Sequence, residues 1–137
     1  MEDTDAIVAA LETHLRTLPE LPPVAWENVN FTPVNGTPYV APFTLFTEPD
    51  DAGFRDSSNI QRGYMQIGLH FPTNTGAGAA RTLAKRLRRH FPRGSSYVAG
   101  GVKTNILATP EITGGTIEEG RYVVRVRVRF YAELQGT

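Results

Sequence analysis

The chain has 137 residues, with 14 Lys or Arg against 14 Asp or Glu, so its formal net charge at pH 7 is zero. This length suffices for one domain with a real core, and 40% hydrophobic with 20% charged residues is typical of a soluble globular protein. The lack of cysteine excludes disulfides and thiolate metal sites and fits the cytosol. Residues 1–5 are acidic, which does not predict a signal peptide. No apolar run approaches ~18 residues, so no membrane span is predicted.

The charges are divided unevenly between the two halves of the chain. Residues 1–60 contain ten acidic and two basic side chains, whereas residues 61–137 contain twelve basic and four acidic ones. The halves therefore carry formal charges of −8 and +8. Folding can intermix these charges within one domain. Alternatively, they form a bipolar surface, which suits head-to-tail contact between identical subunits.

The first element is predicted to be a helix over residues 4–18, with Thr4 as its N-cap. Apolar side chains recur there at spacings of three or four and form one stripe. The stripe consists of Ile7, Val8, Leu11, Leu15 and Leu18. Three prolines within residues 19–23 follow, and proline cannot continue a helix.

Residues 26–33 are predicted to be extended and to lead into a hairpin-type turn at Asn35-Gly36. Residues 39–47 are predicted to form a strand, because their odd-numbered positions are apolar. These positions are Tyr39, Ala41, Phe43 and Leu45. Pro42 lacks a backbone N–H, so its place in this run indicates either an edge strand or a bulge.

Residues 48–59 combine four acidic side chains, two serines and a glycine, a composition that predicts a mobile loop. Phe54 and Arg55 lie inside it. An exposed aromatic ring beside an arginine either has no role or is a docking point that becomes ordered on contact. Phe54 and Arg55 are accordingly candidate contact residues.

The second half of the chain is predicted to supply a strand, a helix and two more strands. Their ranges are 60–71, 76–91, 104–109 and 121–131, with a turn at Gly114-Gly115 before the last. Met65, Ile67, Leu69 and Phe71 form the apolar face of the first of these strands, and Ala80, Leu83, Ala84, Leu87 and Phe91 form the buried stripe of the helix. The fold class is therefore α+β, a mostly antiparallel sheet with two helices packed on it, in the order α-β-β-α-β-β and in a single domain over residues 1–137.

The last strand alternates almost perfectly between apolar and basic side chains. Tyr122, Val124, Val126, Val128 and Phe130 fall on one face, and Arg121, Arg125, Arg127 and Arg129 fall on the other, with Val123 as the exception. Arg125, Arg127 and Arg129 either face water, meet an acidic partner surface such as that of an adjacent subunit, or line a passage for phosphate. We name them, with Arg62 on the polar face of the 60–71 strand, as candidate interface residues.

Catalytic, cofactor and metal motifs are not recognisable. Gly76 and Gly78 resemble part of a nucleotide-binding turn, but the third glycine is absent, so the small residues more simply let the helix approach the sheet. The three histidines are not at metal-ligand spacing, and no serine has a nucleophile-elbow pattern. Glu118 is predicted to be a solvated turn carboxylate. We expect a protein that is not an enzyme and that binds no cofactor or metal.

Basic residues in the second helix and the last strand raise nucleic acid as a partner. The aromatic side chains do not interleave with the arginines as they do on a base-stacking platform, and the pI of about 6.8 is near neutral. Specific recognition of nucleic acid is therefore a lesser alternative. Passive exposure to nucleic acid inside a ring stays open.

Three stretches of the chain, in this order and spacing, resemble a known family. They are residues 26–40 (WENVNFTPVNGTPYV), residues 62–94 from Arg-Gly-Tyr-Met-Gln-Ile to Phe-Pro-Arg-Gly, and residues 117–122 (IEEGRY) running into the last strand. Together they resemble the tail terminator, or tail completion, proteins of long-tailed phages and prophages. The similarity covers nearly the whole chain.

This resemblance implies a structural virion protein, assembled in the host cytoplasm and located at the head-proximal end of the tail. It implies a homohexameric ring that stops polymerisation of the tail tube and joins it to head-completion (connector) proteins, with DNA passing through the lumen unread. The implied partners are a second copy of the chain, the tail tube protein and the connector protein, without a membrane. The family offers no catalytic residues to transfer. A different head–tail connector protein or a tail tube subunit is the alternative function.

Overall fold

The computed structural model describes residues 3–50 and 59–134. These parts contain two helices and seven strands, which confirms the predicted α+β class. In chain order they are α1 (Asp3–Arg16), β1 (Tyr39–Phe46), β2 (Asn59–Pro72), α2 (Gly78–His90), β3 (Ser96–Ala99), β4 (Val102–Ile106), β5 (Glu111–Ile112), β6 (Thr116–Glu118) and β7 (Arg121–Leu134). Neither helix has the length and apolar character needed to cross a membrane.

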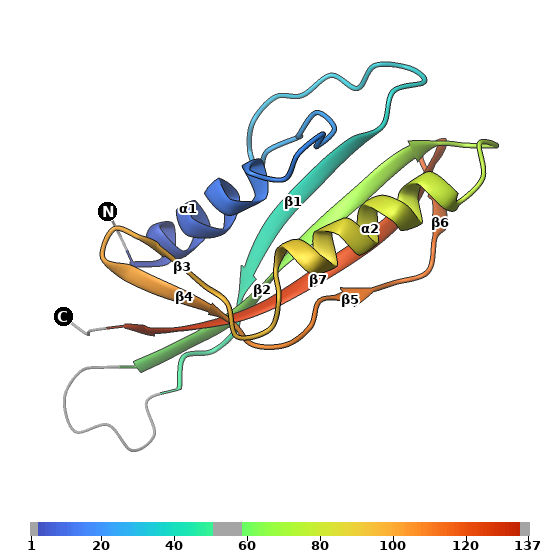
Figure 1. Ribbon diagram of the computed structural model, residues 1–137. Coiled ribbons are helices and arrows are strands. Elements are labelled where there is room, and N and C mark those ends of the chain that lie inside the picture. Colours follow the sequence, from blue (N-terminus) through green and yellow to red (C-terminus); the bar gives the residue numbers. More distant parts are fainter. Residues whose placement is uncertain (1–2, 51–58, 135–137) are drawn as a thin grey trace.

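The basic strand β7 is the centre of one antiparallel sheet. The strand order is β1-β2-β7-β4-β3, and β5 and β6 also pair with β7. Strand β2 follows β7 over its whole length on one edge, while β4, β5 and β6 share the other edge in succession. Figure 1 shows β2 and β7 as the long spine of the molecule, with α2 lying along it. Because β4, β5 and β6 are short, β7 pairs with β2 over more residues than with any other strand.

Both helices pack on the same face of the sheet and enclose one core. The predicted helix stripes are buried, except that Val8 is half-buried, and they join the apolar face of β2 and β7 in a single cluster. Helix α1 lies against β3 and β4, whereas α2 lies against β2, β5 and β7. Burial of this much apolar surface is the main force that fixes both helices.

The opposite face, here called the open face, carries no helix. The register places Leu45, Tyr64 and Arg129 in one row across β1, β2 and β7, and Phe43, Gln66 and Arg127 in the next. The apolar odd-numbered positions of β1 therefore lie on the open face. Its buried positions are Val40, Pro42 and Thr44, on the core side. Polarity alone does not reveal this orientation, because both faces of β1 are largely apolar.

The segment before β1 differs from the prediction. The turn at Asn35-Gly36 is present, with Gly36 at a φ of 81°. However, residues 26–38 form no strand, and the outer edge of β1 receives only one parallel bridge, from Val24 to Val40. The guanidinium of Arg121 donates to the carbonyl oxygens of Thr37 and Val34 at 2.6 and 2.9 Å. These carbonyls are thus satisfied by a side chain, and the turn joins no pair of strands.

The strand pairing decides between the two structures predicted for Pro42, an edge strand or a bulge. Pro42 lies in an edge strand without a bulge, because the register of β1 with β2 is continuous. Strands β3, β5 and β6 are too short to have been predicted. Helix α2 begins after Ala77, which makes no side-chain cap.

Candidate subunit interface

The predicted arginine row lies on the open face of the sheet. Arg125, Arg127 and Arg129 alternate with the buried Val124, Val126 and Val128, as the sequence predicts. Successive guanidinium groups are separated by roughly 7 Å along the strand, because alternate residues of a strand share one face. Each of the three contacts a partner within its own chain, and the partner differs from one arginine to the next.

Arg125 forms a two-pronged ion pair with Glu118 of β6. Its Nη1 donates to Oε2 at 2.7 Å and its Nη2 donates to Oε1 at 2.6 Å. Thr116 donates a further hydrogen bond to Oε2 of Glu118, at 2.6 Å. The bonds from Arg125 and Thr116 lower the pKa of Glu118 to about 2. Glu118 is therefore a specific partner of the strand and not only a solvated turn carboxylate.

Arg129 and Arg127 are held by different chemistry. Arg129 pairs with Glu111 of β5, with its Nη2 at 2.7 Å from Oε1. Arg127 donates to Oε1 of Gln66 at 3.0 Å, and its guanidinium carbon lies 4.3 Å from the centre of the Tyr64 ring. This second contact has the geometry of a cation–π interaction. Along β7, a carboxylate therefore offsets the charges of Arg125 and Arg129, whereas an amide oxygen and an aromatic ring contact Arg127 between them.

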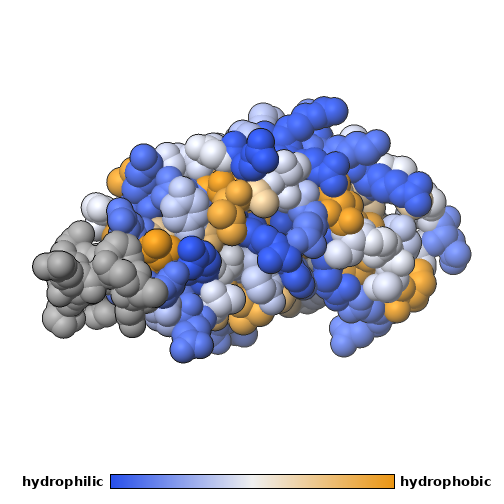
Figure 2. All heavy atoms as spheres, turned by 90° about the horizontal axis from the view of Figure 1, so that it is seen from below, coloured by the Kyte–Doolittle hydropathy of each residue, from blue (hydrophilic) through white to orange (hydrophobic). Residues whose placement is uncertain are grey.

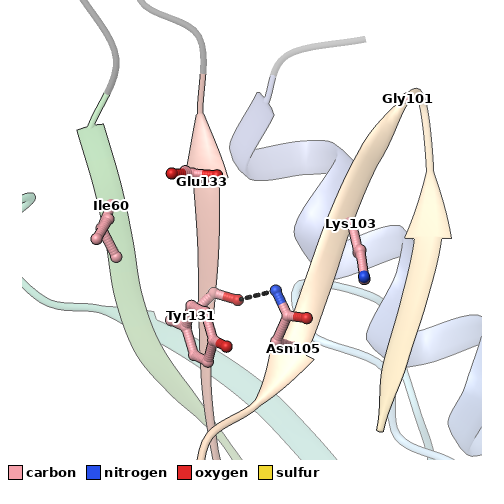
Figure 3. Close-up of a pocket in the computed structure, with 6 residues that line it drawn as sticks. All are labelled: Ile60, Gly101, Lys103, Asn105, Tyr131 and Glu133. Carbon is pink, nitrogen blue, oxygen red and sulfur yellow. Dashed lines mark hydrogen bonds between the residues drawn. The ribbon is translucent and has the colours of Figure 1, made fainter. Parts of the chain in front are cut away.

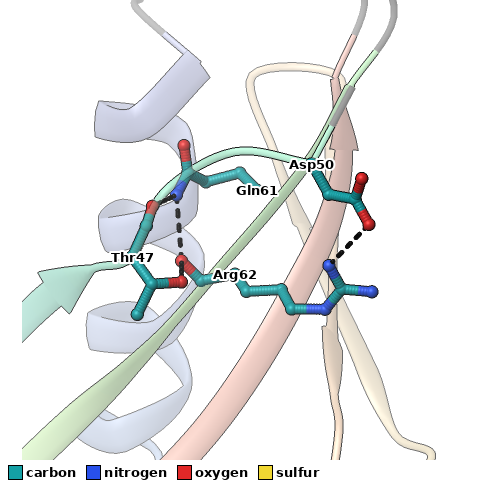
Figure 4. Close-up of polar contacts among 4 residues, drawn as sticks. All are labelled: Thr47, Asp50, Gln61 and Arg62. Carbon is teal, nitrogen blue, oxygen red and sulfur yellow. Dashed lines mark hydrogen bonds and ion pairs between the residues drawn. The ribbon is translucent and has the colours of Figure 1, made fainter. Parts of the chain in front are cut away.

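Arg62 lies at the other end of the open face, opposite Tyr131 of β7. Its guanidinium pairs with Asp50 at 3.3 Å, and its backbone carbonyl accepts hydrogen bonds from Gln61 and Thr47. Figure 4 shows these four residues where the chain leaves β1 and enters β2. The ion pair is exposed on both sides, which limits its contribution to stability to about 0–1 kcal/mol.

Phe54 and Arg55 lie outside the described residues. The remaining predicted interface residues share one face, and the carboxylates that pair with Arg125 and Arg129 lie within the chain. Glu111 and Glu118 both belong to the basic half of the sequence. In the parts of the chain that the structure describes, only the Arg62–Asp50 pair joins the acidic half to the basic half. The other two ion pairs of the described residues lie within the basic half.

The start of β7 is covered by the segment that Arg121 binds. Phe31 packs on Tyr39, with ring centroids 5.0 Å apart, and Tyr39 stacks on His70 at 4.5 Å. Val123, which shares a row with these two rings, is fully buried although it lies on the open face. Burial lowers the pKa of His70, and the charge of Arg125 acts in the same direction. Val123, the exception in the alternation of β7, thus belongs to a small second cluster with the rings of Phe31, Tyr39 and His70.

Helix α2 carries a second group of cations with a different environment. Arg81, Lys85 and Arg88 recur at spacings of four and three, so they share one side of the helix. They line a recess of about 270 Å³ together with the segment from Ile112 to Gly115 and the ring of Tyr122. Arg88 donates to the carbonyl oxygen of Pro110 at 3.2 Å, but no carboxylate among the described residues pairs with any of the three.

Two histidines that are far apart in the sequence meet where the helices end. The rings of His14 and His90 stack with centroids 4.0 Å apart, and His14 also stacks on Tyr97. Each Nε2 lies 2.6 Å from the other residue's backbone carbonyl oxygen. Burial lowers the pKa of His14, with the carbonyl of His90 opposing that shift. The arrangement joins the C-terminal ends of α1 and α2, and the described residues contain no cluster of metal-ligand type around it.

A cavity of about 460 Å³ lies at the far end of the open face. It is lined by Ile60, Gly101, Lys103, Asn105, Tyr131 and Glu133, which come from β2, β4, β7 and the turn before β4 (Figure 3). Asn105 donates to the backbone carbonyl of Tyr131 at 3.4 Å. One ammonium and one carboxylate can bind polar groups, but these six residues include no nucleophile paired with a base.

The exposed surface is described by the distribution of hydrophilic and hydrophobic side chains. In the view from below, Figure 2 shows hydrophilic side chains over most of the face, with hydrophobic ones in small separate patches. A large hydrophobic patch is the usual mark of an obligate interface. On this face the charged groups are therefore the more prominent feature, and they can bind a surface of opposite charge.

Comparison with known proteins agrees with this non-catalytic site. A family model described as phage tail terminator protein matches residues 6–130. The fold is similar to that of a solved structure with a TM-score of 0.77 and 23% sequence identity, over 100% of both chains. At this identity the likeness shows the fold alone. No curated protein matches the chain.

The class that fold and surface define is a small structural α+β protein without a reaction centre in its described part. The family match spans nearly the whole chain, and the chain belongs to the phage tail terminator family. This membership confirms the predicted family and the prediction that the protein is not an enzyme. It also implies a location in the phage tail and partners that are tail-associated.

Proposed function

We propose that the protein forms a closed ring of identical subunits, most simply a hexamer, at the head-proximal end of the phage tail tube. The ring stops polymerisation of the tube and offers a surface to the head-completion (connector) proteins. DNA passes through its lumen without being read. The long tail of a siphophage is the setting that the sequence resemblance implies.

The observation that carries this proposal is the family match over residues 6–130. The charge distribution supports the ring. A contact between two different surfaces of the same chain generates a closed ring or an open filament, depending on the rotation between subunits. The unbalanced halves of this chain supply two such surfaces. A terminator requires the rotation that closes the subunits into a ring.

Size-exclusion chromatography with light scattering, followed by negative-stain electron microscopy, tests the ring directly. We expect discrete closed particles whose mass is a fixed multiple of the 15.1 kDa subunit, in free solution or on isolated tail tubes. Long filaments of the pure protein would instead support the alternative of a tube subunit.

Removal of the gene from its phage or prophage tests the terminator role. Tails made without the protein should vary in length and should not join to heads, while tubes should still polymerise. Tails of normal length that fail only to join heads would support the alternative of a head–tail connector protein. Normal, joined tails would contradict both.

A further inference from the structure

We propose that the recess beside α2 receives the acidic edge of a second copy of this chain. We define the basic recess by Arg81, Lys85 and Arg88, and the acidic edge by Asp5, Glu12 and Glu27. The inference rests on the proposed ring and names the surfaces that form its repeating contact. It places that contact away from the arginine row of β7.

The basic recess is a site whose cations form no ion pair with an acidic side chain among residues 3–50 and 59–134. Arg81 and Lys85 are exposed, and helix α2 contains no acidic residue. The opposite wall is the glycine turn at Gly114 and Gly115. A Cβ atom on Gly115 would lie 2.0 Å from Cζ of Tyr122, so glycine is needed for this ring to form part of the lining. The result is a recess of about 270 Å³ with three cations along one wall, which suits inserted carboxylates.

Within the acidic edge, Glu27 lies at the lateral edge of the sheet that is opposite to β5 and β6. Glu27 accepts a hydrogen bond from the backbone N–H of Thr44 at 3.2 Å, which places it at the outer edge of β1. Asp5 and Glu12 are seven residues apart on α1 and therefore share one side of that helix. Burial raises the pKa of Glu12, Arg16 opposes this shift, and the nearby charge of Glu27 adds to it. The carboxylates of Glu12 and Glu27 thus stand close enough to one another to repel.

Glu27 and the basic recess lie at opposite lateral edges of the sheet, so they can meet only between copies of the chain. The basic recess lies beside β5 and β6, on one side of β7, whereas Glu27 lies beyond β2, at the outer edge of β1. Figure 1 shows the N-terminal ends of α1 and α2 at opposite ends of the molecule. A contact that joins opposite sides of identical subunits is head-to-tail, the type that builds rings.

A second copy of the chain would neutralise both the basic recess and the acidic edge, whereas nucleic acid would neutralise only the recess. A polyanion would satisfy α2 but would leave the acidic edge uncompensated. Because the formal net charge is zero, each copy holds as many acidic as basic groups. Head-to-tail contact matches both sets at once, and complementary charge also steers subunits into the correct orientation.

Charge reversal with mixing tests the proposal. One variant carries Arg81→Glu, Lys85→Glu and Arg88→Glu, and the other carries Asp5→Lys, Glu12→Lys and Glu27→Lys. Each alone should be folded by circular dichroism and should self-associate roughly 100-fold more weakly than the wild-type protein. Their equimolar mixture should associate again, because the native edge of one faces the native recess of the other and both reversed surfaces also match.

A matched control separates this contact from general charge effects. The variant Arg89→Glu, Arg93→Glu and Lys103→Glu changes the net charge as much as reversal of the recess, but these residues do not line it. It should associate as the wild-type protein does. If reversal of Glu12 prevents folding, Glu12→Gln with Glu27→Gln should still weaken association by about tenfold. Sedimentation velocity at about 0.1 M salt and about 1 M salt provides the measurement, with association weakening at the higher concentration.

Two results would overturn the inference. One is wild-type association of the recess variant, and the other is failure of the two folded variants to associate when mixed. If the recess variant assembles normally but loses binding to duplex DNA in a gel-shift assay, the recess faces nucleic acid and not a subunit. Tail length in the phage reports separately on the terminator role, so that role can fail while the contact stands.

Discussion

Two groups of cations in this protein have the same charge but different surroundings. The arginines of β7 are bound by Glu118, Gln66 and Glu111 of their own chain. Arg81 and Lys85 of α2 form no ion pair among the described residues and line an open recess. The difference teaches that the members of a conspicuous row of charges can be paired within their own sheet, whereas less regular charges can lack an ion pair among the described residues.

The largest effect is expected from Gly115→Ala, which alters the recess without changing its charge. The new Cβ would lie 2.1 Å from the hydroxyl oxygen of Tyr122, so the ring must move. Overpacking of this kind costs about 1–3 kcal/mol of unfolding free energy. Urea denaturation should show this loss, and sedimentation should show weaker association. Gly114→Ala is the control, because its Cβ would meet nothing within 4 Å.

Replacement of Arg125, Arg127 and Arg129 by glutamine tests the other side of the comparison. If these arginines serve mainly their own sheet, the unfolding free energy should fall by about 1–2 kcal/mol, since exposed pairs contribute about 0–1 kcal/mol each. Rings and tail lengths should stay normal well below the unfolding temperature. A folded variant that fails to close its ring would show instead that the subunit interface lies on β7. Normal rings with impaired DNA passage would place the row in the lumen.

A smaller effect is expected from protonation of Glu118. Its pKa of about 2 lies below the ordinary 4.5, so its pair with Arg125 stabilises the fold fully above pH 4.5. That contribution is lost as the pH falls from 4.5 towards 2. Melting temperatures over this range should fall more steeply for the wild-type protein than for Glu118→Gln. Parallel curves would show that the ion pair does not stabilise the sheet.

The smallest effect concerns the junction of the two helices. Because burial lowers the pKa of His14 below 6.5, the folded state favours the neutral ring. The stabilisation is present above pH 6.5 and is lost as the pH falls through that value. The melting temperature of the wild-type protein should therefore fall more between pH 8 and pH 5.5 than that of His14→Gln. An equal fall in both proteins would contradict this role.

Strong periodic patterns in the sequence were sufficient to predict the main elements. The alternation of β7 and the stripe through Leu83 and Leu87 each reflect burial of one face, and both are confirmed. The short strands β5 and β6 were not predictable, because two or three residues cannot show a period. They form because β7 offers an unpaired edge beyond β4, which only the folded sheet reveals.

The site was harder to predict than the fold. Glu111 precedes Arg129 by 18 residues, and the partner of Arg127 is 61 residues away in β2, so neither pairing is visible locally. His14 and His90 are separated by 76 residues. The basic side of α2 was visible in the sequence, but its lack of partners was not. Which charges remain free depends on the tertiary structure that satisfies the others.

Zero-length cross-linking with a carbodiimide tests the central claim most directly, because it joins lysine to a carboxylate in contact. The chain has only two lysines, Lys85 in the recess and Lys103 outside it. We predict an intersubunit cross-link from Lys85 to Glu12 or Glu27, confirmed by mixing isotopically labelled and unlabelled subunits. The oligomer ladder should disappear in Lys85→Arg and persist in Lys103→Arg. A ladder that persists in Lys85→Arg through Lys103 alone would contradict the proposed contact.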